Sequence, residues 1–185
     1  MNNKSLIRIS LAVAAAVAAA ILLNVPKGFA KAEIVVDRTP PTVQVKSLCR
    51  SGEQVIWTCT TTRNKIASVC ASRGLTAEKG YVQYRFGTSR KVELELPQGR
   101  TGSQGFFRYA RYTRPLVTML SLTFTNNGAT YEIHDDDNAE EKPPVRSASI
   151  DVTSGEKTAS ITCRQPTSGS LMKLEDIVTR DENRF

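Results

Sequence analysis

Hydrophobic and polar residues alternate along most of the chain after residue 42, and few stretches show the spacing of a helix. Alternation with a period of two places successive side chains on opposite faces, which is typical of a half-buried β-strand. Turn-forming residues separate the alternating stretches. The pattern therefore predicts strands at residues 43–47, 54–60, 66–71, 80–86, 91–96, 106–113, 117–125, 129–134, 147–152 and 158–163.

Short strands at this spacing indicate an all-β fold, and we expect an antiparallel sandwich or barrel of about eight to ten strands. The clearest hairpin signal is Asn127-Gly128, because a type I′ turn needs a positive φ at both central positions. Leu171, Leu174 and Val178 follow helical spacing, which predicts a short C-terminal helix. The last residues, 180–185, are expected to be disordered.

The N-terminal 32 residues have the order of a secretory signal peptide. Basic residues precede an apolar run over 11–23, and Ala30 and Ala32 provide small residues for cleavage before Glu33. The alternative, an uncleaved membrane anchor, is disfavoured because a spanning helix needs roughly 20 apolar residues. We therefore expect a periplasmic or secreted protein that keeps no stable membrane span after cleavage.

Charge and length limit what the mature chain can be. The whole chain of 185 residues carries a net charge of +7, but the leader contributes four basic and no acidic residues, so the remaining 153 residues carry only +3. This small excess argues against a nucleic-acid partner. The length suits one domain. We expect a linker and first strand over 33–48, a disulfide-stapled β domain over 49–165 and a tail over 166–185.

Four cysteines, Cys49, Cys59, Cys70 and Cys163, all follow the leader. An even number in an oxidising compartment indicates two disulfides with three possible connectivities, and the wide spacing does not suit zinc. Alternation along two neighbouring strands favours a Cys59–Cys70 bond, which leaves Cys49 for Cys163. Trp57, close to Cys59, is expected to pack on a disulfide in the core.

His134 is the only histidine, and an acidic run follows it. A Ser-His or Cys-His mechanism would depend on this one imidazole, so acyl-transfer chemistry is disfavoured. Asp135, Asp137 and Glu141 offer oxygen ligands for calcium, but the central Gly and distant Glu of an EF-hand are missing. We expect a solvated loop between strands here, and neither a metal ion nor a cofactor in the protein.

The segment 106–114 interleaves aromatic residues with arginines. Arginine and tyrosine combine contact area with directional hydrogen bonds, which is typical of binding surfaces. The predicted binding residues are therefore Arg108, Tyr109, Arg111, Tyr112 and Arg114. As a strand, the segment places Arg108, Tyr112 and Arg114 on one face and the other two on the opposite face. The alternative is that the aromatic rings fill the core while the arginines face water.

Glu93 and Glu95 lie two residues apart in the predicted strand 91–96. Such a pair of carboxylates could act as acid and base in glycoside hydrolysis. Neighbours of this kind more often face water, and we expect Arg85 to pair with one of them across the hairpin instead.

Several motifs resemble an uncharacterised family of small exported bacterial β-rich proteins: SVCAS at 68–72, GYVQYRFG at 80–87, VELELP at 92–97 and NNGATYEI at 126–133. The resemblance covers roughly residues 49–134 and supplies no mechanism. In architecture only, the leader and small cysteine-containing β domain are similar to periplasmic lysozyme inhibitors. The chain lacks the Ser-Gly-Ala motif of those inhibitors.

Two classes of function remain open at this point. We expect a non-enzymatic binding module of the bacterial envelope, with an inhibitor or immunity protein against a cell-wall-directed enzyme as one form of it. Its partner would be an envelope protein or a cell-wall component. The alternative is a periplasmic glycan-binding or hydrolytic enzyme that uses Glu93 and Glu95.

Overall fold

The computed structural model describes residues 45–185, so the predicted leader lies outside the described residues. This part of the chain is all-β, as predicted. Its strands are β1 (Glu53–Thr61), β2 (Ile66–Ser72), β3 (Val82–Thr88), β4 (Lys91–Leu96), β5 (Arg108–Arg114), β6 (Val117–Asn126), β7 (Ala129–Asn138), β8 (Val145–Ser154) and β9 (Lys157–Gly169), with two 3-10 helices, η1 (Ser103–Phe106) and η2 (Leu171–Leu174). None of the helices in residues 45–185 has the length and apolar character to span a membrane.

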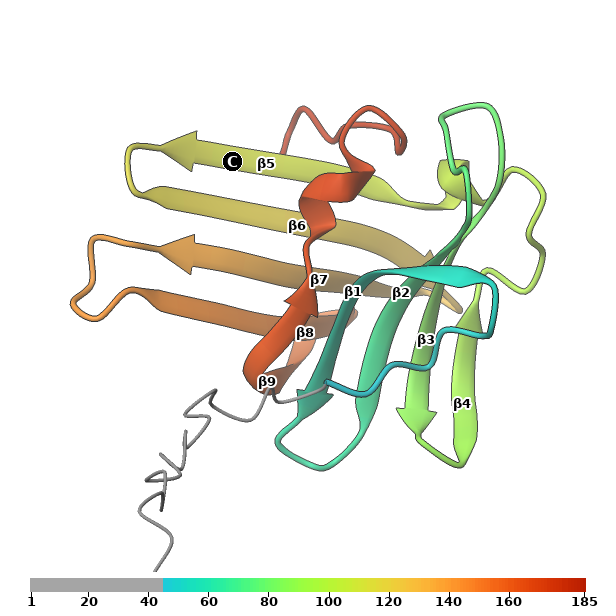
Figure 1. Cartoon of the computed structure of the whole chain (residues 1–185), viewed down its shortest axis with the longest axis horizontal. Coiled ribbons are helices and arrows are strands. Elements are labelled where there is room, and N and C mark those ends of the chain that lie inside the picture. The colour runs from blue at the N-terminus through green and yellow to red at the C-terminus, as the bar shows by residue number, and fades with distance from the viewer. Residues whose placement is uncertain (1–44) are drawn as a thin grey trace, which may run out of the picture. The chain divides into compact units, whose positions relative to one another are not determined.

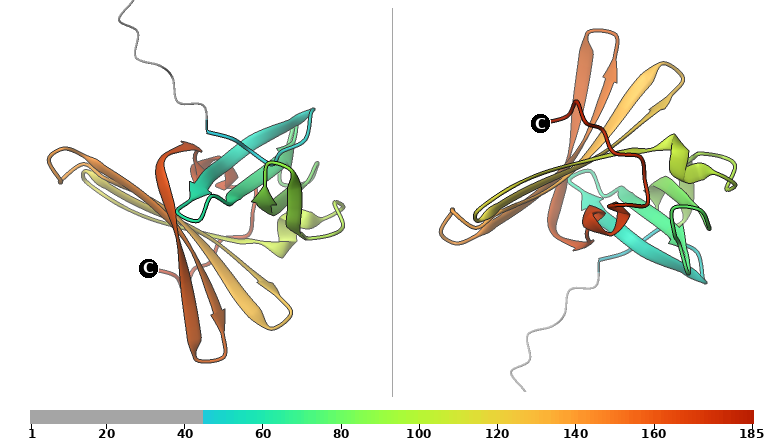
Figure 2. Two further views of the ribbon diagram at one scale, coloured as in Figure 1. Left: turned by 90° about the horizontal axis from the view of Figure 1, so that it is seen from below. Right: turned by 90° about the horizontal axis from the view of Figure 1, so that it is seen from above.

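All nine strands form one antiparallel sheet with the order β4-β3-β2-β1-β9-β8-β7-β6-β5. The sheet curls into a half-barrel, so that β1–β4 run across the direction of β5–β8 and the two halves face each other (Figure 1 and Figure 2). A predicted strand at 43–47 is not formed in the part described, since residues 45–47 have no regular structure. Its first residues lie outside the described range.

Strand β9 joins the two halves of the sheet. Its first half pairs with β8 and its second half pairs with β1, with a register shift between Thr58 and Thr60. Gly169 ends the strand with φ of 80°, and a Cβ there would collide with the carbonyl of Ile56. Only glycine fits this close approach at positive φ, so the backbone of β9 can lie directly against β1.

The core lies between the two halves and is rich in aromatic rings. Phe124 of β6 is at its centre, with ring centroids 5.0 Å from Tyr84 of β3, 5.1 Å from Tyr131 of β7 and 5.4 Å from Phe107. Such pairs contribute beyond their buried area. Trp57 is fully buried, as predicted. It belongs to the same core cluster as the disulfide-bonded Cys59 and Cys163.

Two disulfides form, as predicted, but the predicted pairing is wrong. The bonds are Cys49–Cys70 and Cys59–Cys163. The tight turn after β1 sets a register in which Cys59 lies opposite Ala67, whereas Cys70 lies further along β2. Cys59 therefore meets β9 on its other side, where Cys163 is located.

The acidic run is also different from the prediction. Residues 135–137 belong to β7 instead of a solvated loop, and Asp135 is buried. Its carboxylate accepts hydrogen bonds from Arg146 of β8 at 2.8 Å and from the Leu171 N–H at 3.1 Å. These partners on neighbouring segments stabilise a charged residue inside the strand, so Asp135 and Asp137 do not form the calcium-type loop that was weighed.

The C-terminal tail is part of the fold. Its predicted helix is the single 3-10 turn η2, and Leu171, Leu174 and Val178 bury their side chains in the core. The expectation of disorder at 180–185 is wrong, because the Asp181 N–H donates to the Tyr109 carbonyl at 2.8 Å. The tail thus continues along the edge of β5.

Candidate functional site

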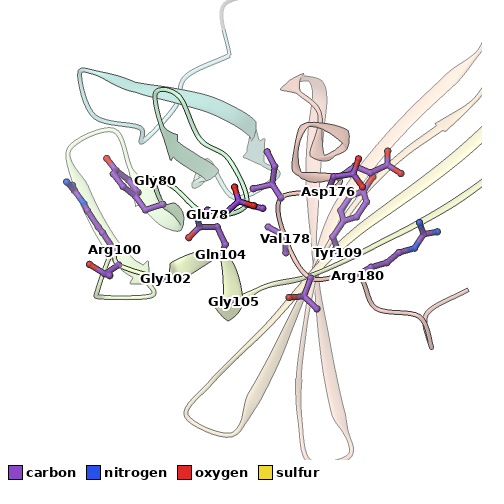
Figure 3. A pocket seen from close by; sticks show the side chains of 16 residues that line it. Glu78, Gly80, Arg100, Gly102, Gln104, Gly105, Tyr109, Asp176, Val178 and Arg180 are labelled. Atoms are coloured by element: carbon purple, nitrogen blue, oxygen red, sulfur yellow. The ribbon is translucent and has the colours of Figure 1, made fainter.

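A cleft of about 880 Å³ lies between three segments that are far apart in the sequence. One is the connection from β2 to β3 around residues 77–81, the second is the loop at 100–105, and the third is the tail at 175–180. Figure 3 shows Arg100 on one side, Asp176 and Arg180 on the other, and Glu78 and Gln104 between them. A volume of this size is typical of sites for small ligands.

Hydrogen bonds to the η1 turn hold two of these walls together. The Gln104 amide donates to the carbonyls of Thr76 and Lys79 at 3.2 Å, which ties the turn to the β2–β3 connection. The Ser103 hydroxyl accepts from the Val82 N–H at 2.8 Å. The cleft therefore has a preformed shape on this side, which lowers the entropy cost of binding.

Arg100 and Tyr81 form one end of the cleft. The guanidinium of Arg100 lies over the Tyr81 ring, 4.6 Å from its centroid, in a cation–π contact. Burial raises the pKa of the Tyr81 hydroxyl, which also donates to Glu53 at 2.9 Å. The Arg100 guanidinium is 3.8 Å from Glu53, beyond hydrogen-bond distance, and its side chain is 46% exposed, so its N–H groups remain accessible to a ligand.

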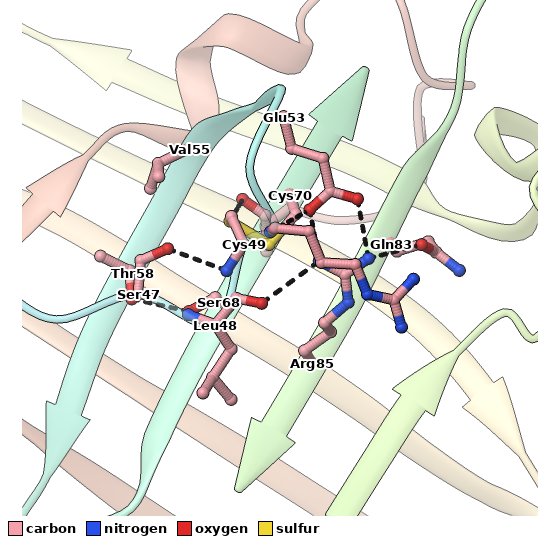
Figure 4. The surroundings of a disulfide bond; sticks show 12 residues. Ser47, Leu48, Cys49, Glu53, Val55, Thr58, Ser68, Cys70, Gln83 and Arg85 are labelled. Atoms are coloured by element: carbon pink, nitrogen blue, oxygen red, sulfur yellow. Dashed lines mark hydrogen bonds and ion pairs between the residues drawn. A yellow bond between two sulfur atoms is a disulfide. The ribbon is translucent and has the colours of Figure 1, made fainter. Parts of the chain in front are cut away.

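Behind this wall lies a buried charged network, drawn in part in Figure 4. Arg85 is 0% exposed and donates to both carboxylate oxygens of Glu53, at 2.5 and 2.8 Å, and to Glu95 at 2.7 Å. Burial alone would raise the pKa of Glu53, but the hydrogen bonds that it accepts, above all from Arg85, lower that pKa to about 2. The network joins β1, β3 and β4.

Glu93 and Glu95, the predicted carboxylate pair, have separate ion-pair partners. Arg85 pairs with Glu95 across the hairpin, as expected. Glu93 instead pairs with Lys65 at 2.5 Å. Because each carboxylate is bound by a different cation, the two are not presented together as an acid and base.

Tyr109 lines the cleft from β5 and has an unusual hydroxyl. The residue is 1% exposed, yet its hydroxyl has no hydrogen-bond partner among residues 45–185. Burial, with Glu175 nearby, raises the pKa of this phenol to about 12, so it remains a neutral donor. An unpaired buried hydroxyl has a free-energy cost. Its oxygen has less than 1 Å² of exposed surface, so a ligand in the cleft can pair with it once the side chains that cover it move aside.

The charges of the cleft balance. Glu175 is neutralised by Arg111 at 2.5 Å. The other charged residues of the lining are the acids Glu78 and Asp176 and the bases Arg100 and Arg180, of which Arg180 lies 3.7 Å from the exposed Glu182. The site thus offers both acceptors and donors with no net charge, which suits a polar ligand without excess charge of either sign.

The structure divides the predicted binding residues between two faces of the sheet, as the strand pattern implies. Tyr109 and Arg111 belong to the cleft side. Arg108, Tyr112 and Arg114 lie on the opposite face, where Arg108 donates to two backbone carbonyls and Arg114 pairs with Glu140. The segment does not form one continuous surface.

Sequence reasoning did not identify most of the cleft. Arg100 and Arg180 lie in segments without periodicity, whereas Asp176 lies within the predicted C-terminal helix but not on its apolar side. The glycine-rich stretch at 99–105 is a local signal for the loop that carries Arg100. One further group, Cys49, Glu53 and Cys70, lies close enough together for a metal ion, but its sulfurs are joined in a disulfide. Comparisons of the chain with protein-family models, curated proteins and solved structures find no match.

Proposed function

We propose that the protein is an exported, non-enzymatic binding module of the bacterial envelope that holds a cell-wall glycan in the cleft. The buried Tyr109 hydroxyl, unpaired at the base of a charge-balanced cleft, carries this proposal. A glycan presents neutral hydroxyl and amide groups that both donate and accept. It can pair with carboxylates, guanidinium groups and the phenol at once, whereas a strongly charged ligand would be repelled by one set of side chains.

Export is supported by the leader-like N-terminus and by the two disulfides, which form and persist in oxidising compartments. Binding without hydrolysis is favoured because Glu93 and Glu95 are each bound by a cation and lie outside the cleft. The hydrolytic alternative would need other carboxylates.

A protein partner is the second candidate within the same class. It is favoured by an exposed aromatic pair, Tyr112 and Phe185, whose ring centroids lie 6.2 Å apart on the face opposite the cleft. Exposed large rings of this kind are enriched at protein interfaces.

Binding of soluble peptidoglycan fragments, measured by calorimetry, tests the glycan proposal. The variant Tyr109→Phe removes only the hydroxyl, and a lost neutral hydrogen bond of about 0.5 to 1.5 kcal/mol corresponds to roughly 2- to 12-fold weaker binding. Its stability should not fall, since that hydroxyl has no partner in the free protein. Tyr112→Phe is the matched control and should bind as the unaltered protein does.

Equal affinity of the two variants would place the ligand outside the cleft. Failure of every fragment to bind, together with capture of an envelope protein that is lost when Tyr112 and Phe185 are both changed to Ser, would favour the protein partner instead.

A further inference from the structure

A second cluster of polar side chains lies on the sheet face opposite the cleft, centred on His134 of β7. Ile133 faces the core, so His134 points the other way. Ser121 of β6 is directly opposite His134 in the β-ladder. Glu132 precedes His134 by two residues on the same face, and Asp151 of β8 is directly opposite Glu132.

Several oxygen atoms in this cluster are buried and unpaired. In residues 45–185, six buried side-chain nitrogen or oxygen atoms have no hydrogen-bond partner, and three of them are Ser121 Oγ, Asp136 Oδ1 and Asp151 Oδ1. Ser121 is 1% exposed, and its register places it against His134. Native proteins leave few such groups unpaired, so three around one imidazole point to a missing cation or donor.

One pair of side chains in the cluster already has the spacing of two metal ligands. His134 Nε2 lies 3.4 Å from Asp151 Oδ2 and 3.9 Å from Glu132 Oε2. With zinc–ligand bonds of about 2.0 to 2.1 Å, two ligands of a tetrahedral site are roughly 3.4 Å apart. His134 and Asp151 already meet this spacing. The Glu132 and Asp151 oxygens that face His134 are more than 4.8 Å apart, so Glu132 has to turn toward Asp151 before all three can hold one ion. The three side chains are 17 to 33% exposed, so an ion can enter from solvent.

We propose that His134, Asp151 and Glu132 bind a divalent transition-metal ion of the zinc type. One imidazole with two carboxylates is a donor set that zinc accepts, whereas calcium prefers oxygen ligands alone. Asp136 and Ser121 lie beside the site, where their unpaired oxygens are free to hydrogen-bond to a water bound by the ion. A fourth position is left to water.

The C-terminal tail limits access to this site. Figure 2 shows the tail crossing the edge of β5 from one face of the sheet to the other. There the Arg184 guanidinium binds Glu132 Oε1 at 2.6 Å. A metal ion and Arg184 therefore compete for the same carboxylate, and removing the guanidinium should strengthen metal binding.

Calorimetry with Zn²⁺, and separately with Ca²⁺, on the purified protein with both disulfides intact tests the proposal. We expect one Zn²⁺ per chain and no Ca²⁺. His134→Ala and Asp151→Asn should each weaken Zn²⁺ binding by at least about tenfold, and Arg184→Gln should strengthen it several-fold. Asp137→Asn is the matched control, because it makes the same Asp-to-Asn change as Asp151→Asn, but on the face of β7 opposite His134.

Circular dichroism of each variant without metal separates a lost ligand from a lost fold. A folded His134→Ala protein that no longer binds Zn²⁺ supports the site. The proposal is overturned if the unaltered protein binds no Zn²⁺, or if binding survives in folded His134→Ala and Asp151→Asn proteins. A thermal melt with and without Zn²⁺ gives an independent readout, since a site present only in the folded state raises the melting temperature.

Discussion

The substitution Glu53→Gln is the sharpest test of how the β1–β4 half of the sheet is held together. Glu53 accepts two hydrogen bonds from the guanidinium of the buried Arg85, one at each carboxylate oxygen. Its pKa is lowered from 4.5 to about 2 in the folded protein. At 1.36 kcal/mol per pKa unit, this shift corresponds to about 3 kcal/mol of stability at neutral pH from the ionised form. Losing one partner of a buried pair costs a similar 3 to 5 kcal/mol.

The pH dependence has a definite sign. A carboxyl group whose pKa is lower in the folded state stabilises the protein above its unfolded pKa, and the stabilisation is lost as pH falls through the folded pKa. For Glu53 the loss should therefore occur as pH falls from about 4.5 to about 2. Urea unfolding of the unaltered protein and of Glu53→Gln, at a series of pH values between 7 and 2.5, measures the difference directly.

Glu93→Gln is the control, because its partner Lys65 and Glu93 itself are each about one third exposed and such surface pairs contribute about 0 to 1 kcal/mol. The difference between the unaltered protein and Glu53→Gln should be large at pH 7 and should shrink below pH 4. A gap that does not change with pH, or a cost no greater than that of Glu93→Gln, would refute the assigned role of the carboxylate.

Two further outcomes follow from the covalent structure and the N-terminus. Non-reducing peptide mapping should find Cys49 joined to Cys70 and Cys59 joined to Cys163. The Cys59–Cys163 bond spans 104 residues and the Cys49–Cys70 bond spans 21, so changing the first pair to Ala should cost more stability, about 4.7 against about 3.3 kcal/mol. Mass spectrometry of the exported protein should place its N-terminus at or within a few residues of Glu33; recovery of the whole chain in the membrane fraction would contradict cleavage.

Local pattern was enough to locate most strands. The prediction for 91–96 matches β4, and those for 54–60 and 117–125 match β1 and β6 within one residue at each end. Alternation and turn residues act over a few positions, so they can be read without the rest of the fold. The second half of β9 was missed, since it contains Pro166 and lacks alternation, and its pairing with β1 is what extends it.

The pairing register between strands could not be predicted from the local sequence pattern. The disulfide pairing failed because a shift of a few residues between β1 and β2 changes which cysteine faces which neighbour. The charged run at 135–137 was assigned to a loop because three acids in a row look solvent-exposed. Asp135 is neutralised by Arg146, which comes from a different strand, and the local pattern does not show that the two residues meet. The cleft was not predicted for the same reason, because the irregular segments that line it come together only when the sheet has formed.

The tail explains why both proposed sites depend on the complete fold. Burying Leu171, Leu174 and Val178 contributes about 1.5 to 3 kcal/mol for each side chain and so opposes the entropy cost of ordering the tail. Once these three are fixed, residues 175–180 form one wall of the cleft and Arg184 reaches Glu132 on the opposite face. A segment that looks like a polar appendage in the sequence thus connects the two faces of the sheet on which the proposed glycan and metal sites lie.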